Sequence, residues 1–174
     1  MRYLVTGAAG HVATLALPGL AGRHTLRLTD LRAPARLPED ASFEALVAGA
    51  DVYIQKFRPG VAEKIGAGEA RLRELNPRLI YCAISGFGPD GPAAGRPSYD
   101  TVAQAASGFL KLLVNPANPR VVGPALADAL TGFYAAYGIL GALYEREKLG
   151  HGRKVEVSML EAMTHFNLDA FTHL

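Results

Sequence analysis

The chain has 174 residues and a net charge of +2, and 49% of its residues are hydrophobic while 20% are charged. These proportions exclude an intrinsically disordered chain, and the scattered basic residues give no reason to expect a nucleic-acid or membrane partner. The single cysteine, Cys82, excludes an internal disulfide. Because the N-terminus lacks the layout of a secretory signal and no run of about 20 apolar residues occurs, we expect a cytoplasmic protein without a transmembrane helix.

Residues 1–44 predict the start of a Rossmann-like unit. Residues 1–7 (MRYLVTG) and 25–30 (TLRLTD) have the character of strands, and a glycine turn and a helix are expected between them. The prolines and scattered charges of residues 32–39 (RAPARLPE) indicate a loop or junction. The sequence therefore predicts a boundary between residues 1–44 and residues 45–174.

The second part predicts strands that alternate with helices. Strands are expected at 51–55, 76–85 and 154–159, and helices at 42–50, 61–66, 68–75, 99–113, 123–148 and 160–171. A glycine- and proline-rich loop, GFGPDGPAAGRPS, is too long for a tight turn and is typical of a functional or mobile segment. The alternation predicts an α/β fold with a Rossmann-like, largely parallel sheet flanked by helices.

The glycine turn after the first strand has two interpretations. Gly7 permits a tight turn, Gly10 would let backbone approach a pyrophosphate, and Asp30 ends the second strand where a carboxylate could bind a ribose. The sequence VTGAAG resembles the opening of extended short-chain dehydrogenases over residues 1–32, which implies an NAD site. A strand–turn–helix that binds nothing explains the glycines as well, and Pro18 falls inside the expected helix, where it should kink or end it.

Three further residues imitate a dehydrogenase active site. Such enzymes need a Ser or Thr and a Tyr-x-x-x-Lys pair, and Thr131, Tyr144 and Lys148 occur at plausible spacing. However, Thr131 and Tyr144 are predicted to lie on one uninterrupted helix, where thirteen residues separate them by roughly 20 Å. They could not hold one substrate carbonyl, so we interpret Tyr144 and Lys148 as a solvated helix end.

Five blocks of the second part resemble family III CoA-transferases and the related acyl-CoA racemases. In chain order they are ADVYIQKFRPGVAEKIG, LNPRLIYCAISGFGPDGP, RPSYDTVAQAASG, LADALTG and GILGALYEREKLGHGRKVEVSMLEA. The resemblance covers about three-quarters of the chain and implies a partial family III domain at residues 45–174. It implies a transferase that moves CoA between an acyl-CoA and a carboxylic acid, with coenzyme A as a substrate and with no metal or required cofactor.

The resemblance places the catalytic nucleophile at Asp128, in the block LADALTG. A carboxylate can attack an acyl-CoA thioester, and the released CoA can return to form an aspartyl-CoA intermediate. Asp128 lies among Ala and Leu at the start of a predicted helix, where the helix N-terminus would stabilise an anion. The alternative is a helix N-cap, which is a common place for aspartate.

The resemblance implies contacts with CoA at eight further residues: Phe57, Arg58, Lys64, Ser85, Gly86, Phe87, Tyr99 and Asp100. Arg58 and Lys64 suit a pyrophosphate, although exposed Arg and Lys beside a turn are also simply solvated. Lys56 departs from the family pattern, which often has a small polar residue there. Tyr99 stands where the racemases carry a histidine, which favours CoA transfer over racemisation.

Family III enzymes are roughly twice as long as this chain and form interlocked dimers. The resemblance therefore implies a truncated or fused chain, with acyl-CoA and carboxylate substrates and a homodimer or higher oligomer. The helix predicted at residues 131–148 is apolar around most of its circumference, as a helix buried on several sides would be. We expect oligomerisation or poor solubility, and little or no turnover by the chain alone.

Overall fold

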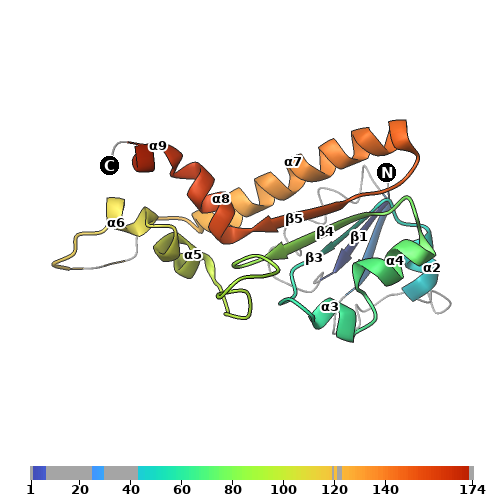
Figure 1. Ribbon diagram of the computed structural model, residues 1–174, viewed down its shortest axis with the longest axis horizontal. Helices are drawn as coiled ribbons and strands as arrows, with labels where there is room; N and C mark the ends of the chain where they lie inside the picture. The colour runs from blue at the N-terminus through green and yellow to red at the C-terminus, as the bar shows by residue number, and fades with distance from the viewer. Residues whose placement is uncertain (1, 7–24, 30–42, 119, 121–122, 173–174) are drawn as a thin grey trace. The chain divides into compact units, whose positions relative to one another are not determined.

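The computed structural model describes residues 2–6, 25–29, 43–118, 120 and 123–172. Within them, the predicted α/β class is confirmed by a five-stranded sheet with strand order β2-β1-β3-β4-β5 (Figure 1). The strands are β1 (Arg2–Thr6), β2 (Thr25–Thr29), β3 (Val52–Gln55), β4 (Ile80–Ser85) and β5 (Lys154–Ser158). β1 pairs in parallel with both β2 and β3, and β3 pairs in parallel with β4. Gly7, Gly10 and Asp30 lie outside the described residues.

The helices of the second part follow the predicted order, but two of the predicted helices are each broken into two. They are α2 (Phe43–Ala48), α3 (Val61–Lys64), α4 (Glu69–Leu75), α5 (Asp100–Ala106), α6 (Phe109–Leu113), α7 (Leu126–Leu149), α8 (Met159–Phe166) and α9 (Leu168–Thr172). The single helix predicted at 99–113 is broken at Gly108, whose φ of 80° is left-handed and cannot continue an α-helix. The predicted helix at 160–171 is likewise interrupted, at Asn167.

The chain divides into two compact units, and the first comprises residues 1–55, 62–83 and 139–155. Its described core is built around two stacked aromatic rings, Tyr53 and Tyr81, whose centroids lie 5.3 Å apart. Leu72 and Leu79 are fully buried beside them. Each such side chain contributes about 1.5–3 kcal/mol by leaving water. Cys82 in β4 is also fully buried in the described structure.

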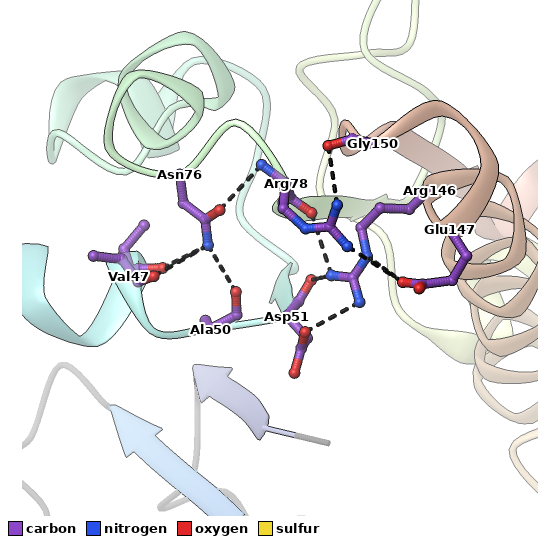
Figure 2. Close-up of polar contacts among 9 residues, drawn as sticks. Val47, Ala50, Asp51, Asn76, Arg78, Arg146, Glu147 and Gly150 are labelled. Carbon is purple, nitrogen blue, oxygen red and sulfur yellow. Dashed lines mark hydrogen bonds and ion pairs between the residues drawn. The ribbon is translucent and has the colours of Figure 1, made fainter.

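Asn76, just after α4, completes the C-terminal end of α2 in this unit. The last carbonyl groups of a helix have no partner within the helix. The Asn76 Nδ2 donates to the carbonyl oxygens of Val47 at 3.1 Å and Ala50 at 2.8 Å (Figure 2). Its Oδ1 accepts from the backbone N–H of Arg78, which fixes the amide in place. One side chain therefore ties the loop before β4 to the segment that leads into β3.

Arg146, near the end of α7, is the buried cation of the same unit. Its side chain is only 9% exposed and its Nη2 atom lies 3.1 Å from Asp51 Oδ1. Its Nη1 atom donates to the carbonyl oxygens of Asp51 and Arg78, at 3.4 and 3.3 Å (Figure 2). Arg78 in turn reaches the Gly150 carbonyl and the Glu147 carboxylate. The last turn of α7 is thus tied to the residues that precede β3 and β4.

The second unit comprises residues 56–61, 84–138 and 156–174, and its described core lies among α5, α8 and the first turns of α7. Ala103 and Ala127 are fully buried there with Met163. α8 is capped by Ser158, because its Oγ accepts the Glu161 N–H and also donates to the Glu161 carboxylate. Ala103 of α5 and Ala127 at the start of α7 thus belong to the same buried cluster.

α7 has one buried and one exposed apolar stripe. The buried stripe is Ala127, Thr131, Ala135, Ile139 and Leu143. The exposed stripe is Phe133, Tyr137, Leu140 and Tyr144, whose exposed fractions lie between 64% and 79%. No transmembrane helix was expected from the sequence, but α7 is long and apolar enough to cross a membrane by length and composition alone. A core helix of a soluble protein meets the same description. Part of the apolar surface predicted for this helix is therefore exposed in the described structure.

Candidate functional site

A cationic pocket lies within the second unit. It is lined by residues 56–59, 85–86, 94 and 96–99. Three of these are basic: Lys56, Arg58 and Arg96, all of them exposed. No acidic side chain is among the lining residues that the structure describes. Guanidinium and ammonium groups around one hollow are the donors that bind phosphate groups in proteins.

The pocket brings together five of the eight residues predicted to contact CoA: Phe57, Arg58, Ser85, Gly86 and Tyr99. Lys64, Phe87 and Asp100 are not among its described lining residues. Lys64 is exposed as the last residue of α3. Phe87 follows the pocket residue Gly86 and is half-buried, and Asp100 begins α5 directly after Tyr99.

Lys56 and Arg96 were not predicted as binding residues. The parallel pairing of β3 with β4 provides a signal that could have identified both residues. Because β3 and β4 are parallel neighbours, the loops that follow them begin at the same edge of the sheet, where α/β proteins bind ligands. Lys56 directly follows β3, and Arg96 belongs to the long loop after β4. Basic residues in both loops therefore indicate a shared anion site.

Gly86 is a glycine because the space beside its Cα is occupied. A Cβ added there would lie 2.2 Å from the Cβ of Ser98, which also lines the pocket. The Gly86 carbonyl also accepts the N–H of Leu160, at 3.1 Å. Steric exclusion thus explains this glycine, and the close approach of Gly86 and Ser98 joins two walls of the pocket.

Gly86→Ala is expected to push the Ser98 wall away and to lower the free energy of unfolding by about 1–3 kcal/mol, the usual cost of overpacking. Urea denaturation followed by circular dichroism measures the loss. Gly95→Ala is the matched control, since a Cβ at Gly95, in the same loop, meets no atom within 4 Å. Equal stability of the two variants would contradict the packing argument.

Asp128 is the third residue of α7, and its helix is capped by a different aspartate. Asp100 Oδ1 accepts the backbone N–H of Ala127 at 2.7 Å and that of Asp128 at 3.2 Å. The Gln104 amide donates to the other oxygen, Asp100 Oδ2, at 2.5 Å. The Asp128 carboxylate itself makes no hydrogen bond within the described part of the chain, so the capping role that was the alternative for Asp128 belongs to Asp100.

The environment of Asp128 favours the protonated form. Partial desolvation of the carboxyl raises its pKa above the ordinary value, and the negative charge of Asp100 raises it further. The positive charge of Lys56 acts in the opposite direction. Asp128 is exposed, so the desolvation is only partial. A carboxylate that makes no hydrogen bond in the described structure keeps its lone pairs available for attack on an electrophile.

The residues that imitate a dehydrogenase site do not form one. Thr131 and Tyr144 both lie on α7, as predicted, so they are separated along one helix. Thr131 is only 3% exposed, and its hydroxyl donates to the Ala127 carbonyl of its own helix. Tyr144 is exposed, and the Lys148 ammonium lies 4.3 Å from the centre of its ring. This arrangement supports the interpretation of Tyr144 and Lys148 as a solvated helix end.

Comparison with known proteins gives a consistent family. The sequence profile of CoA-transferase family III matches residues 22–173. The chain is 43% identical over 128 residues to the acetyl-CoA:oxalate CoA-transferase of Acetobacter aceti, which covers 72% of this chain and 33% of the relative. It is 39% identical over 127 residues to the succinyl-CoA:mesaconate CoA-transferase of Haloarcula hispanica, covering 70% of this chain and 32% of the relative. The match thus spans about a third of the length of these relatives.

Solved structures agree with the sequence comparison. A CAIB/BAIF family protein from Brucella suis superposes with a TM-score of 0.71 at 36% identity, over 75% of this chain and 35% of that protein. Rv3272 from Mycobacterium tuberculosis superposes with a TM-score of 0.73 at 30% identity, over 87% of this chain and 41% of that protein. The family match begins before the boundary predicted at residue 45, and α2 (Phe43–Ala48) runs across that boundary.

Proposed function

This chain belongs to CoA-transferase family III, and on that premise we propose that its cationic pocket binds the CoA of an acyl-CoA while Asp128 acts as the nucleophile. The observation that carries the proposal is that the two carboxylates at the start of α7 have different surroundings. Asp100 satisfies the helix N-terminus, and Asp128 is left with a raised pKa and no hydrogen bond in the described structure. The acceptor is a carboxylic acid, and the relatives named above use oxalate and mesaconate.

The proposed reaction needs only carboxylates and the thiol of CoA. An oxygen of the Asp128 carboxylate attacks the thioester carbonyl carbon, the C–S bond breaks, and CoA leaves as a thiolate. The thiolate attacks the Asp128 carbonyl carbon of the resulting mixed anhydride, which releases the donor carboxylate and leaves an aspartyl-CoA thioester. The acceptor carboxylate then attacks that thioester and expels the CoA thiolate. The thiolate takes the acyl group from the second anhydride and restores the Asp128 carboxylate.

The pocket supports binding of the phosphate groups of CoA. Arg58 and Arg96 can each form two parallel hydrogen bonds with a phosphate, and Lys56 adds a point charge. Lys64, which is exposed at the end of α3, stays a predicted CoA contact. Tyr99, 76% exposed and beside the pocket, is available to pack against the CoA, and its identity favours transfer over racemisation.

The partners of the chain follow from the same family. We propose a cytoplasmic homodimer or higher oligomer in which the exposed stripe of α7 is covered, since an apolar stripe of this length in water favours association. The proposal does not extend to NAD, because Gly7, Gly10 and Asp30 lie outside the described residues and no observation favours a dinucleotide there.

Isothermal titration calorimetry with free CoA tests the pocket. Arg58→Gln and Arg96→Gln are each expected to weaken CoA binding about 10- to 100-fold, because a charge-assisted hydrogen bond contributes about 1.5–3 kcal/mol. Lys111→Gln, on α6 and outside the pocket, removes the same charge from the same unit and should leave the affinity unchanged. Equal weakening in all three variants would indicate a general charge effect, and binding of NAD but not of CoA would refute the proposed site.

A further inference from the structure

Asp100 and Gln104 form a hydrogen-bonded pair on one face of α5. They are four residues apart, which places their side chains on adjacent turns. Gln104 is only 2% exposed, and its amide donates to Asp100 Oδ2. We infer that this pair is a positioning device, which caps α7 in place of Asp128 and so keeps the Asp128 carboxylate available for covalent chemistry. The inference deepens the proposed function, and it rests on that function only for the chemical role of Asp128.

The competing arrangement is built into the sequence of α7. The first N–H groups of any helix lack partners within the helix, and a carboxylate in the first turn is an effective acceptor for them. Asp128 is in that first turn. A carboxylate that accepts backbone N–H groups is stabilised as an anion, and its pKa falls. A capping Asp128 would therefore be a weaker nucleophile with its lone pairs occupied.

In the structure Asp100, and not Asp128, accepts the N–H groups at the start of α7. A single oxygen, Oδ1, accepts from both Ala127 and Asp128, which lie 27 and 28 residues later in the chain. The negative charge also suits the positive end of a 24-residue helix. With its other oxygen held by Gln104, Asp100 has both carboxylate oxygens engaged by protein donors. We therefore assign Asp100 a role that acts through Asp128, in place of the direct CoA contact expected from the sequence.

Gln104 fixes the direction of the capping carboxylate. Rotation of the Asp100 carboxyl would break the contacts with α7, and the hydrogen bond from the buried amide opposes that rotation. Ala103, the neighbour of Gln104, packs with Ala127 in the same buried cluster, so α5 and the start of α7 are held together beside the cap. The cap therefore lies beside the core of this unit.

Two substitutions at Asp100 separate the loss of the cap from the loss of charge. Asp100→Asn removes the charge but retains an oxygen that can accept the two N–H groups, whereas Asp100→Ala removes both. NMR titration of the side-chain carboxyl carbons of ¹³C-labelled protein, together with amide exchange at Ala127 and Asp128, measures the result. Asp128 is expected to titrate at a lower pKa in Asp100→Ala than in Asp100→Asn, because it takes over the cap. Because Asp128 then replaces Asp100 as the acceptor, protection of the two amides in Asp100→Ala should be lost when Asp128 is protonated, whereas protection in Asp100→Asn should not depend on Asp128.

Further variants and a chemical readout complete the test. Gln104→Leu should shift the Asp128 titration in the same direction as Asp100→Ala, and Asp169→Ala, in the first turn of α9, should shift nothing. Covalent labelling of Asp128 by an acyl-CoA should slow at least tenfold in Asp100→Ala and less than threefold in Asp100→Asn. Identical titration and exchange in the two Asp100 variants would overturn the inference. Absence of labelling in every variant and in the unsubstituted chain would refute the proposed function, while the titration would still decide the role of the pair.

Discussion

Asp128→Asn is expected to reduce covalent capture of CoA or acyl group by about four orders of magnitude or more, which is the usual loss when a catalytic nucleophile is removed. The amide cannot form the mixed anhydride, whereas the pocket side chains and the Asp100 cap remain in place. Intact-protein mass spectrometry after incubation with acetyl-CoA measures the adduct. Binding of free CoA should persist in the variant, which separates the loss of chemistry from the loss of the site.

Asp169→Asn is the matched control, since Asp169 also lies in the first turn of a helix in the same unit. It should label as fast as the unsubstituted chain.

The folded chain holds the Asp128 proton more tightly than the unfolded chain, because the pKa of Asp128 is raised. Ionised Asp128 therefore costs stability, a cost that is absent below the unfolded pKa and fully present above the raised folded pKa. Asp128→Asn should consequently unfold at the same or a slightly higher urea concentration at pH 7, and a marked loss of stability would contradict this account.

The same pKa direction gives the labelling reaction a pH dependence. Only the ionised carboxylate attacks the thioester, so the rate should fall as the pH is lowered through the raised pKa of Asp128. That fall is expected above the ordinary aspartate value of about 3.9. In Lys56→Gln the labelling rate should fall at a still higher pH, because the Lys56 charge lowers the pKa of Asp128.

Arg146→Met is expected to lower the free energy of unfolding by about 3 kcal/mol, the lower end of the range for breaking a buried ion pair. Methionine can fill the same volume, but it donates no hydrogen bond to the Asp51 and Arg78 carbonyls and gives no charge to the Asp51 carboxylate. The lower end applies because Asp51 is 26% exposed and partly screened by water. Urea denaturation followed by circular dichroism measures the change.

Arg78→Met provides the comparison for this second substitution. Arg78 also binds a carbonyl and a carboxylate, those of Gly150 and Glu147, but its side chain is 51% exposed. Exposed ion pairs contribute about 1 kcal/mol or less, so the loss should be at least twofold smaller than for Arg146→Met. Equal losses in the two variants would show that burial of Arg146 is not what makes its contacts important.

The elements of the second part were predictable because their signals are local. The apolar run of β4 and the length of α7 can be read within single segments, and the blocks that form the pocket are each short and contiguous. The break at Gly108 was missed because glycine is tolerated in helices and only the backbone shows its left-handed φ. Local pattern therefore sufficed for the existence of elements, but it missed the breaks within two predicted helices, at Gly108 and at Asn167.

The arrangement at Asp128 was only partly predictable. The sequence indicated a carboxylate at a helix start, but it could not show that Asp100 would supply the capping oxygen from so far along the chain. That contact depends on the start of α5 meeting the start of α7, beside the buried cluster that contains Ala103 and Ala127. The boundary at residue 45 and the dehydrogenase-like character of residues 1–32 stay predictions.

Cys82 is the only cysteine of the chain, and its burial makes it useful in both the labelling and the urea denaturation experiments. Burial raises its pKa to about 11, so at neutral pH almost none of it is the reactive thiolate. An acyl adduct on the native chain should therefore not arise from cysteine. In urea the same thiol becomes accessible, and its rate of reaction with an alkylating reagent would report opening of β4 in the Arg146 and Arg78 variants without any added label.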